Sequence, residues 1–419
     1  MDSDEALMAV KDGHKVLVAS AAAQPQVLLE ALRRRLRALQ GISLFHMLPM
    51  LPEVPYLADD VAGKVCFQTC YPGSAVRACV NEGTGEFVPA FLSEYTDMTS
   101  RFGPDVALLQ VSPPDKHGFC SLGVTVLQLK RAIEHASVVI AQINHKMPRT
   151  HGESFVHVSE ITHFVEAEME VAELPRPVIG ETEKAIGSYI AGLIRDKDCL
   201  QLGIGAIPDA VLGFLTDKRG LGIYSEMFSD GVMELYEAGV IDNKHKNIHK
   251  GKMIATFVMG TRKFYDFIDD NPSILMLPSD VCNDPCNIGQ NDRLISINSS
   301  VSVDLMGQAA SDCIGTRQYS GVGGQVDFIR GAQRSKDGVS ILAFPATAGK
   351  EGALSRIVAQ HAAGTPITTT RNEIDYVVTE YGVARLKYKT LRERANELIA
   401  ISHPDFRAEL RDALKKFNW

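Results

Sequence analysis

The sequence predicts an α/β protein of two open domains, each with a mostly parallel sheet and helices on both faces. Short apolar runs of strand length alternate with helix-like patterns along most of the chain, which is typical of βαβ units. Runs such as Val106–Val111 and Val138–Ile143 are largely apolar, as expected for parallel strands that are covered on both faces. A chain of 419 residues is longer than one hydrophobic core usually supports, so we expect two domains.

The first part of the chain opens with a βα unit. An apolar run from Lys15 to Ser20 leads into a loop of small residues, and apolar residues at helical spacing follow from Val27 to Leu39. Further apolar runs are bounded by Pro, Gly or charged residues, as strands commonly are. The expected helices cover residues 4–12, 27–39 and 74–82, and the expected strands cover 15–20, 42–48, 65–69, 87–91, 106–111 and 138–143.

A break in this pattern marks the expected domain boundary. Between Glu166 and Glu181 acidic residues prevail, and Leu174–Val178 contains two prolines, which excludes an internal helix or a central strand. We therefore expect an N-terminal domain of residues 1–175 and a C-terminal domain of residues 176–419. The two halves show no exact sequence repeat.

The α/β alternation resumes in the second part of the chain. The stretch Ile295–Leu305 alternates apolar and polar residues, which predicts either one strand with a solvated face or a pair of strands. The C-terminus is basic and helical in pattern. The expected helices cover residues 181–196, 208–215 and 231–238, with another starting at 260, and the expected strands cover 199–203, 222–226, 253–258, 339–344 and 376–379.

Composition argues against several classes of partner and location. The net charge is −8, and the largest basic cluster, at residues 33–37, fits a solvated helix face, so we expect no nucleic acid partner. The eight cysteines include no C-x-x-C pair, which favours free thiols in a reducing compartment. No apolar run approaches 18 residues and the N-terminus is acidic, so we expect no membrane span, no signal peptide and a cytoplasmic protein.

A glycine loop after the expected strand 199–203 is the first candidate site. Gly203 and Gly205 are followed by Pro208, where a dinucleotide fingerprint would have its third glycine, and no acidic residue ends a strand at the expected distance. Three interpretations remain open: a dinucleotide site, a tight turn without a ligand, and a loop whose amides hold an oxyanion or a phosphate.

Glu226 ends the next expected strand and is the second candidate. It is either a functional carboxylate at the end of an apolar run, or an ordinary acid before a helix that Ser225 or Asp230 caps. Carboxyl ends of parallel strands meet at one edge of a sheet, so the glycine loop and Glu226 are expected to face one crevice. Such a crevice suits chemistry on a carbonyl group.

A histidine series invites a metal site that the spacing disfavours. His145, His151, His157 and His163 recur every six residues, which in a continuous strand separates neighbours by roughly 20 Å. They cannot share one ion unless the chain folds back, so satisfied or exposed histidines are favoured, with at most a polar loop around Arg149. The sequence lacks H-E-x-x-H, G-x-S-x-G and Walker motifs, which disfavours zinc proteases, elbow-type serine hydrolases and P-loop ATPases. We expect no metal.

Taken together, the motifs resemble those of one family over essentially the whole chain. The sequence is similar to the acetyl-CoA hydrolase/transferase family, and within it to the 4-hydroxybutyrate (butyrate-type) CoA-transferases. The resemblance implies two CoA-transferase-like α/β domains with the active site between them, and a homodimer or higher oligomer. It rests on the motifs at residues 110–123, 147–152, 203–210, 225–231, 320–328 and 379–382.

The same resemblance implies roles for individual residues. Glu226 corresponds to the glutamate nucleophile, and the amides of Gly203, Ile204 and Gly205 correspond to an oxyanion hole that Asn283 assists. The chain departs from many relatives at Ala346-Thr-Ala-Gly-Lys350, where they have a serine and one residue fewer before the lysine. The implied contacts to CoA come from Gln201, Leu202, Gly323, Gly324 and Lys350.

The implied activity is acyl-CoA:carboxylate CoA transfer, with 4-hydroxybutyrate or butyrate exchanged against acetate-type acids. It implies a ping-pong route through an acyl-glutamyl anhydride and a glutamyl-CoA thioester. No prosthetic group is expected, because the CoA thioester is itself a substrate. The alternatives are a short-chain acyl-CoA hydrolase on the same scaffold and a non-catalytic CoA-binding protein.

Overall fold

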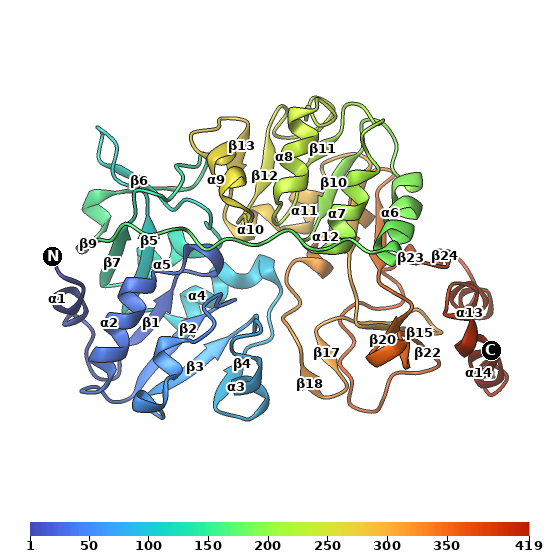
Figure 1. Cartoon of the computed structure of the whole chain (residues 1–419), viewed down its shortest axis with the longest axis horizontal. Helices are drawn as coiled ribbons and strands as arrows, with labels where there is room; N and C mark the ends of the chain where they lie inside the picture. Colours follow the sequence, from blue (N-terminus) through green and yellow to red (C-terminus); the bar gives the residue numbers. More distant parts are fainter. Residues whose placement is uncertain (419) are drawn as a thin grey trace. The chain divides into compact units, whose positions relative to one another are not determined.

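The computed structural model describes residues 1–418 and divides them into two compact units, coloured by sequence in Figure 1. Unit 1 contains residues 1–175, 254–282 and 318–321. Unit 2 contains residues 176–253, 283–317 and 322–418 of the described chain. The chain therefore passes more than once between the units, and the division into domains 1–175 and 176–419 stays a prediction.

Unit 1 is built on a seven-stranded sheet in the order β4-β3-β2-β1-β5-β7-β9. All of its neighbouring strands are parallel. Strand order reverses between β1 and β5. The strands are β1 (Lys15–Val18), β2 (Ile42–His46), β3 (Val65–Thr69), β4 (Gly85–Phe87), β5 (Val106–Val111), β7 (Val138–Ile143) and β9 (His163–Glu166).

Both faces of this sheet are covered, as a parallel sheet requires. Val106 and Leu108 pack into the cluster formed with helices α1 and α2, and Ala107 and Leu109, which point the other way, are fully buried too. The helices are α1 (Ser3–Leu7), α2 (Gln26–Leu36), α3 (Arg77–Asn81), α4 (Tyr95–Phe102), α5 (Leu129–His135), α9 (Arg262–Ile268) and α10 (Ser279–Cys282). Two further strand pairs are β6 (Phe119–Ser121) with β8 (Phe155–His157) and β12 (Met253–Ala255) with β13 (Ile274–Met276).

Unit 2 is built on a six-stranded sheet in the order β11-β10-β14-β19-β23-β24. Its pairs are parallel except for the last, β23 with β24. Ile341 and Val378 are buried on the face opposite to the core cluster of Leu342 and Val377. The strands are β10 (Cys199–Leu202), β11 (Gly222–Ile223), β14 (Leu294–Asn298), β19 (Val339–Ala343), β23 (Tyr376–Thr379) and β24 (Gly382–Arg385).

Helices flank this second sheet and small strand pairs extend from it (Figure 1). The helices are α6 (Glu181–Leu193), α7 (Ala206–Gly213), α8 (Asp230–Glu237), α11 (Pro285–Ile288), α12 (Gln325–Arg334), α13 (Leu391–Ala400) and α14 (Arg407–Leu414). The small strands are β15 (Ser302–Asp304), β16 (Ala309–Ala310), β17 (Cys313–Ile314), β18 (Arg317–Gln318), β20 (Thr347–Ala348), β21 (Leu354–Ser355) and β22 (Ile357–Val358). Mostly parallel sheets thus form both units, which confirms the predicted fold class.

Some predicted elements end early or are wrong, for identifiable reasons. The strand expected at 87–91 is wrong, because β4 ends at Phe87 and Pro89, which lacks an N–H, follows. The alternating stretch Ile295–Leu305 forms two strands that belong to different sheets, β14 and β15. The strand expected to reach Glu226 stops at Ile223.

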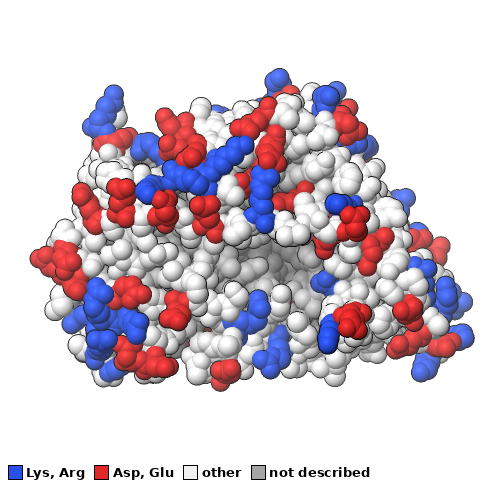
Figure 2. Space-filling model, viewed as in Figure 1, with Lys and Arg blue, Asp and Glu red and all other residues white. Residues whose placement is uncertain are grey.

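The described residues can be compared with the expectations for membrane spans, basic clusters and cysteines. No helix among residues 1–418 is long and apolar enough to cross a membrane. On the face drawn in Figure 2, Lys and Arg side chains are interspersed with Asp and Glu side chains. All eight cysteines are free thiols, as the spacing predicted.

Candidate active site

Two neighbouring strands of unit 2 end side by side at the candidate site. Strand β10 ends directly before the Gly203–Gly205 loop, and β11 ends at Ile223, shortly before Glu226. The strands are parallel, with Leu200 paired to Ile223, and neighbouring strands lie about 4.8 Å apart. The glycine loop and Glu226 therefore leave the sheet at the same edge.

The hydroxyl of Ser225 joins these two strand ends. Its Oγ donates to the carbonyl oxygen of Leu202 at 2.9 Å and accepts from the Leu202 N–H at 3.3 Å. Ser225 does not cap the following helix, since α8 begins at Asp230 and is preceded by Ser229. The residue before Glu226 is thus fixed against the residue before the glycine loop.

Buried polar groups hold the end of β11 from a second side. Lys246 is 2% exposed, and its Nζ donates to the carbonyl oxygens of Ile223 at 2.8 Å and of Lys252 at 2.7 Å. Asn243 Oδ1 accepts from the Ile223 N–H at 2.8 Å. No pattern in the sequence indicated Lys246 or Asn243, because both reach β11 through the tertiary fold.

The glycine loop presents free main-chain donors to open space. Gly205 has φ +116°, which favours glycine, and it immediately precedes α7. A Cβ atom added to Gly203 or Gly205 would meet no atom within 4 Å. Among the described residues, the N–H groups of Ile204 and Gly205 make no hydrogen bond. The loop can therefore donate to an oxygen of a ligand, in the manner of a helix N-terminus.

Glu226, Asn283 and Gly324 come together although they are far apart in the chain. Gly324 lies directly before α12 with φ −91°, a conformation open to any residue. Space is the restriction, because a Cβ atom at Gly324 would overlap Glu226 Oε2 and Asn283 Nδ2. Glycine at this position lets the main chain approach the carboxylate of Glu226, which is a half-buried residue.

The surroundings of Glu226 raise its pKa from the ordinary 4.5 to about 7. Removal of water from the carboxylate is the main cause, and the negative charge of Asp327, in the first turn of α12, adds to it. The Gly324 N–H and the Asn283 amide oppose the shift, since both favour the ionised form. Glu226 therefore exchanges a proton near neutral pH, as catalytic carboxyl groups often do.

The side-chain amide of Asn283 is fully buried without a hydrogen bond of normal geometry. Neither Nδ2 nor Oδ1 has such a partner among the described residues. A buried polar group left unpaired costs about 1–3 kcal/mol. Asn283 thus holds a donor ready beside Glu226.

The other predicted site residues differ in burial and in the hydrogen bonds that they make. Gln201 is buried, and its side chain bonds to Ser296 Oγ at 2.7 Å and Asn298 Nδ2 at 3.1 Å, so it is occupied within the sheet. Leu202 is buried and bonded to Ser225 as described above, and Gly323, with φ +58°, is next to Gly324. Lys350 is exposed in the turn Lys350–Gly352, and within residues 1–418 its side chain bonds to none of the site residues.

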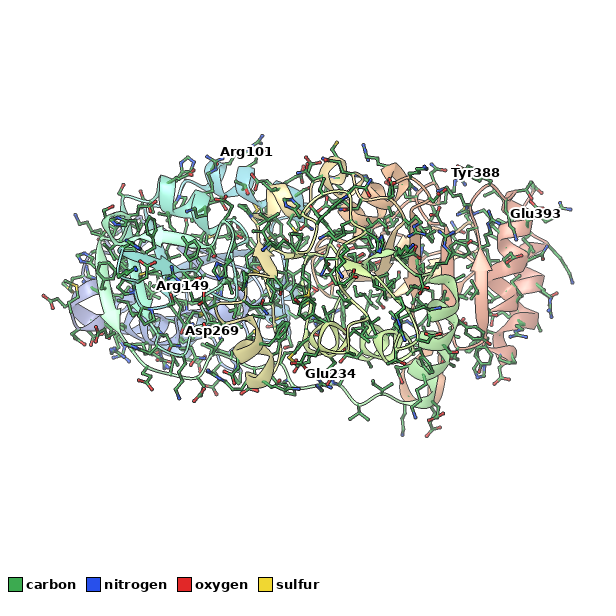
Figure 3. All side chains as sticks on the ribbon, turned by 90° about the horizontal axis from the view of Figure 1, so that it is seen from above. Arg101, Arg149, Glu234, Asp269, Tyr388 and Glu393 are labelled. Atoms are coloured by element: carbon green, nitrogen blue, oxygen red, sulfur yellow. The ribbon has the colours of Figure 1, made fainter. Side chains whose placement is uncertain are left out.

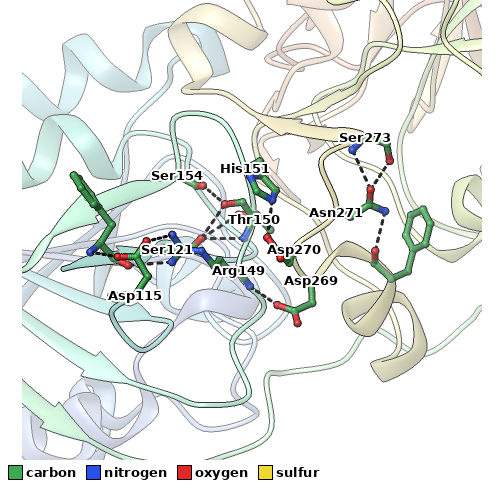
Figure 4. Close-up of polar contacts among 12 residues, drawn as sticks. Asp115, Ser121, Arg149, Thr150, His151, Ser154, Asp269, Asp270, Asn271 and Ser273 are labelled. Carbon is green, nitrogen blue, oxygen red and sulfur yellow. Dashed lines mark hydrogen bonds and ion pairs between the residues drawn. The ribbon is translucent and has the colours of Figure 1, made fainter. Parts of the chain in front are cut away.

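The histidine series lies on separate elements of unit 1. His151 Nε2 is 2.9 Å from Asp270 Oδ1, and Arg149 Nη2 is 2.7 Å from Asp115 Oδ2, so these side chains hold a polar loop together (Figure 4). His157 lies in β8 and His163 in β9. In the described part of the chain, no three His, Cys, Asp or Glu side chains cluster in a way that could hold a metal ion.

Comparison with known proteins places the chain in a family. The model of the acetyl-CoA hydrolase/transferase N-terminal domain matches residues 1–175, and that of the C-terminal domain matches residues 260–414. The chain belongs to the acetyl-CoA hydrolase/transferase family. This confirms the resemblance inferred from the motifs.

Relatives within the family match this chain over nearly its full length. The chain is 49% identical to the 4-hydroxybutyrate coenzyme A transferase of Clostridium kluyveri, over 99% of this chain and 96% of that protein. It is 35% identical to the butyryl-CoA:acetate CoA-transferase of Anaerostipes caccae, over 100% of this chain and 96% of that protein.

A solved structure within the family has the same fold. The crystal structure of the 4-hydroxybutyrate CoA-transferase of Porphyromonas gingivalis superposes with a TM-score of 0.86 at 42% identity, covering 99% and 97% of the two chains. The chain is an enzyme of the CoA-transferase kind.

Proposed function

We propose that the protein transfers CoA between short carboxylic acids of the 4-hydroxybutyrate or butyrate type and acetate, with Glu226 as the nucleophile. The observation that carries this proposal is the setting of Glu226. Its carboxylate, with a pKa of about 7, lies beside the Gly324 main chain and the buried Asn283 amide, and both of these groups favour its ionised form. Relatives that act on these acids supply the substrate class.

The reaction follows from carboxylate chemistry in balanced steps. Glu226 attacks the thioester carbonyl of the acyl-CoA, so a C–O bond forms, the C–S bond breaks, and an acyl-glutamyl anhydride and CoA thiolate result. The thiolate attacks the glutamyl carbonyl of the anhydride, which releases the donor acid and leaves a glutamyl-CoA thioester. The acceptor carboxylate attacks this thioester, and the same steps in reverse give the new acyl-CoA and free Glu226.

Each attack on a carbonyl places negative charge on an oxygen that the enzyme must stabilise. The free N–H groups of Ile204 and Gly205 and the amide of Asn283 are the donors that we assign to this task. One preorganised donor lowers such a barrier by about 3 kcal/mol. The N–H groups of Ile204 and Gly205 make no hydrogen bond among the described residues, so no internal bond of theirs has to break first.

We assign CoA contacts to the residues around these donors. Leu202, Gly323 and Gly324 would act through the main chain, Gln201 through its support of the β10 end, and Lys350 through its exposed ammonium group. Binding energy from the nucleotide and pantetheine parts aligns the thioester for attack by a weak nucleophile. We further propose a homo-oligomeric, cytoplasmic enzyme that needs no prosthetic group.

An exchange assay tests this function. Incubation with butyryl-CoA and labelled acetate is expected to give labelled acetyl-CoA, and Glu226→Gln is expected to abolish it. Glu409→Gln, which changes an exposed carboxylate on α14, is the matched control and should keep wild-type rates. Full exchange by Glu226→Gln would disprove the assignment.

Hydrolysis is the second candidate activity, because Glu226 is partly exposed. Water that reaches the anhydride would hydrolyse it before the CoA thiolate could attack. A hydrolase would release free thiol from butyryl-CoA in the absence of any acid acceptor. A transferase would release thiol much more slowly than it forms acetyl-CoA. Binding of CoA without either reaction would instead indicate a non-catalytic protein, which the intact Glu226 and Asn283 argue against.

A further inference from the structure

A cavity lies in unit 2, at the edge of the sheet opposite to Glu226. It has a volume of about 440 Å³, within the ~300–1,000 Å³ typical of small-molecule sites. Its lining comes from the loop before β23, the loop between β24 and α13, and Gln333 in the last turn of α12. Since Gly324 precedes the first turn of α12, the helix length separates the two places by roughly 14 Å.

The lining is cationic, and none of the described residues that form it carries a carboxylate. Arg371, Lys387, Lys389 and Arg394 all contribute. Two of them face acids outside the lining: Lys387 Nζ is 3.0 Å from Asp375 Oδ1, and Lys389 Nζ is 2.5 Å from Glu397 Oε1. An ammonium group has three donors, so each lysine keeps further N–H groups for a ligand.

The two arginines have no carboxylate in contact among the described residues. Arg394 is buried and donates to the carbonyl oxygens of Met306, Leu386 and Arg371 at 2.9, 3.1 and 2.7 Å. Arg371 is exposed, and within residues 1–418 its guanidinium makes one polar contact, to Met306 Sδ at 3.6 Å. Burial lowers the pKa of Arg394, the Arg371 charge lowers it further, and the negative charge of Asp304 opposes this shift. An anion between the guanidinium groups would relieve this repulsion.

An aromatic ring stands at the rim of this cavity. Tyr388 is 92% exposed, and its φ of +62° is uncommon for a residue other than glycine. Lys387 Nζ lies 5.7 Å from the centre of the ring. Figure 3 shows Tyr388 at the surface, near Glu393 at the start of α13. The exposed face of the ring is free to stack on a planar group.

We propose that this cavity is a binding site for a phosphorylated small molecule, with the phosphates held by Arg371 and the two lysines. Guanidinium and ammonium groups are the side chains that recognise phosphate best, and arginine can bind two of its oxygens at once. The shared chemistry is a diphosphate group, either as the inorganic ion or as part of a nucleotide whose base would stack on Tyr388.

Calorimetric titration of the full chain with inorganic diphosphate and with ADP tests the proposal. Arg371→Gln is the test variant, because Arg371 is exposed and makes no strong internal bond. Loss of charged hydrogen bonds of about 1.5 kcal/mol or more corresponds to at least about tenfold weaker binding. Arg411→Gln, which removes the same charge from an exposed position on α14, is expected to bind both probes like the wild type.

The outcomes separate this site from the CoA site and one ligand source from the other. Arg371→Gln should leave the KM for acyl-CoA unchanged, since the cavity lies at the sheet edge opposite to Glu226. Tighter binding of ADP than of diphosphate, reversed by Tyr388→Ala, would identify a nucleotide; equal binding would identify the inorganic ion. Absence of saturable binding, or equal weakening by Arg371→Gln and Arg411→Gln, would overturn the proposal.

Discussion

Replacement of Glu226 by glutamine is predicted to stabilise the protein at alkaline pH while abolishing exchange. The folded protein holds the Glu226 proton more tightly than the unfolded chain, because the pKa is about 7 in the fold against the ordinary 4.5. Between these values the native state binds more protons, so the free energy of unfolding falls as pH rises through this window. Glutamine has the same shape and cannot ionise, and it escapes this loss.

The size of the effect follows from the same two values. At about 1.4 kcal/mol per pKa unit, the difference amounts to about 3 kcal/mol above pH 7. Partial exposure of Glu226 reduces this energy difference through solvent screening. We therefore expect the free energy of unfolding of Glu226→Gln to exceed that of the wild type by about 2 kcal/mol at pH 8. Near pH 4.5 the gain should shrink towards zero.

Urea unfolding of both proteins at several pH values between 4.5 and 8, followed by circular dichroism, measures this difference. Glu409→Gln controls for loss of one negative charge at an exposed position and should show no comparable pH-dependent gain. The placement of Glu226 in a desolvated site would be refuted if Glu226→Gln were less stable than the wild type at pH 8. It would also be refuted if the gain in the free energy of unfolding did not depend on pH.

Three further substitutions test the neighbours of Glu226. Gly324→Ala puts a Cβ atom into the Glu226 carboxylate. Steady-state kinetics should show at least about a hundredfold loss of kcat/KM, comparable to the loss of a preorganised donor, while the circular dichroism spectrum stays unchanged. A wild-type kcat/KM would contradict this packing. Asn283→Ala removes one oxyanion donor and should lower kcat by about 10²–10³-fold, whereas a change in KM alone would assign Asn283 to binding. Asp327→Asn removes a negative charge that raises the Glu226 pKa. The Glu226 pKa should therefore fall in this variant, and the rise of kcat/KM with pH should shift to lower pH. An unchanged pH profile would show that Asp327 does not act on the nucleophile.

The fold was largely predictable because buried parallel strands leave a strong signal in the sequence. Strands 65–69, 106–111, 138–143 and 376–379 have the predicted bounds, since each is a run of mostly apolar residues that ends at polar or turn-forming residues. Strand β11 was predicted too long because Tyr224 continues the apolar run, yet the Ser225 hydroxyl takes the place of ladder bonds. Side-chain hydrogen bonds of this kind leave no periodic trace.

The site was predictable only in part. The glycine loop and Glu226 follow expected strands, so parallel topology alone places them at one edge. Asn283 and Gly324 came from family resemblance, and no local pattern could join residues so far apart in the chain. Asp327 was not predicted, although its position in the first turn of the helix that follows the glycine loop 321–324 was a signal in the sequence. Lys246 acts through tertiary packing, which sequence periodicity does not report.

Trapping the covalent intermediate tests the central claim most directly. The protein is incubated with butyryl-CoA, treated with borohydride, digested and examined by mass spectrometry. The proposed glutamyl-CoA thioester predicts that the side chain at position 226 is reduced to the alcohol only after exposure to acyl-CoA. An unmodified peptide containing Glu226, or reduction at another acidic residue, would contradict the assignment of the nucleophile.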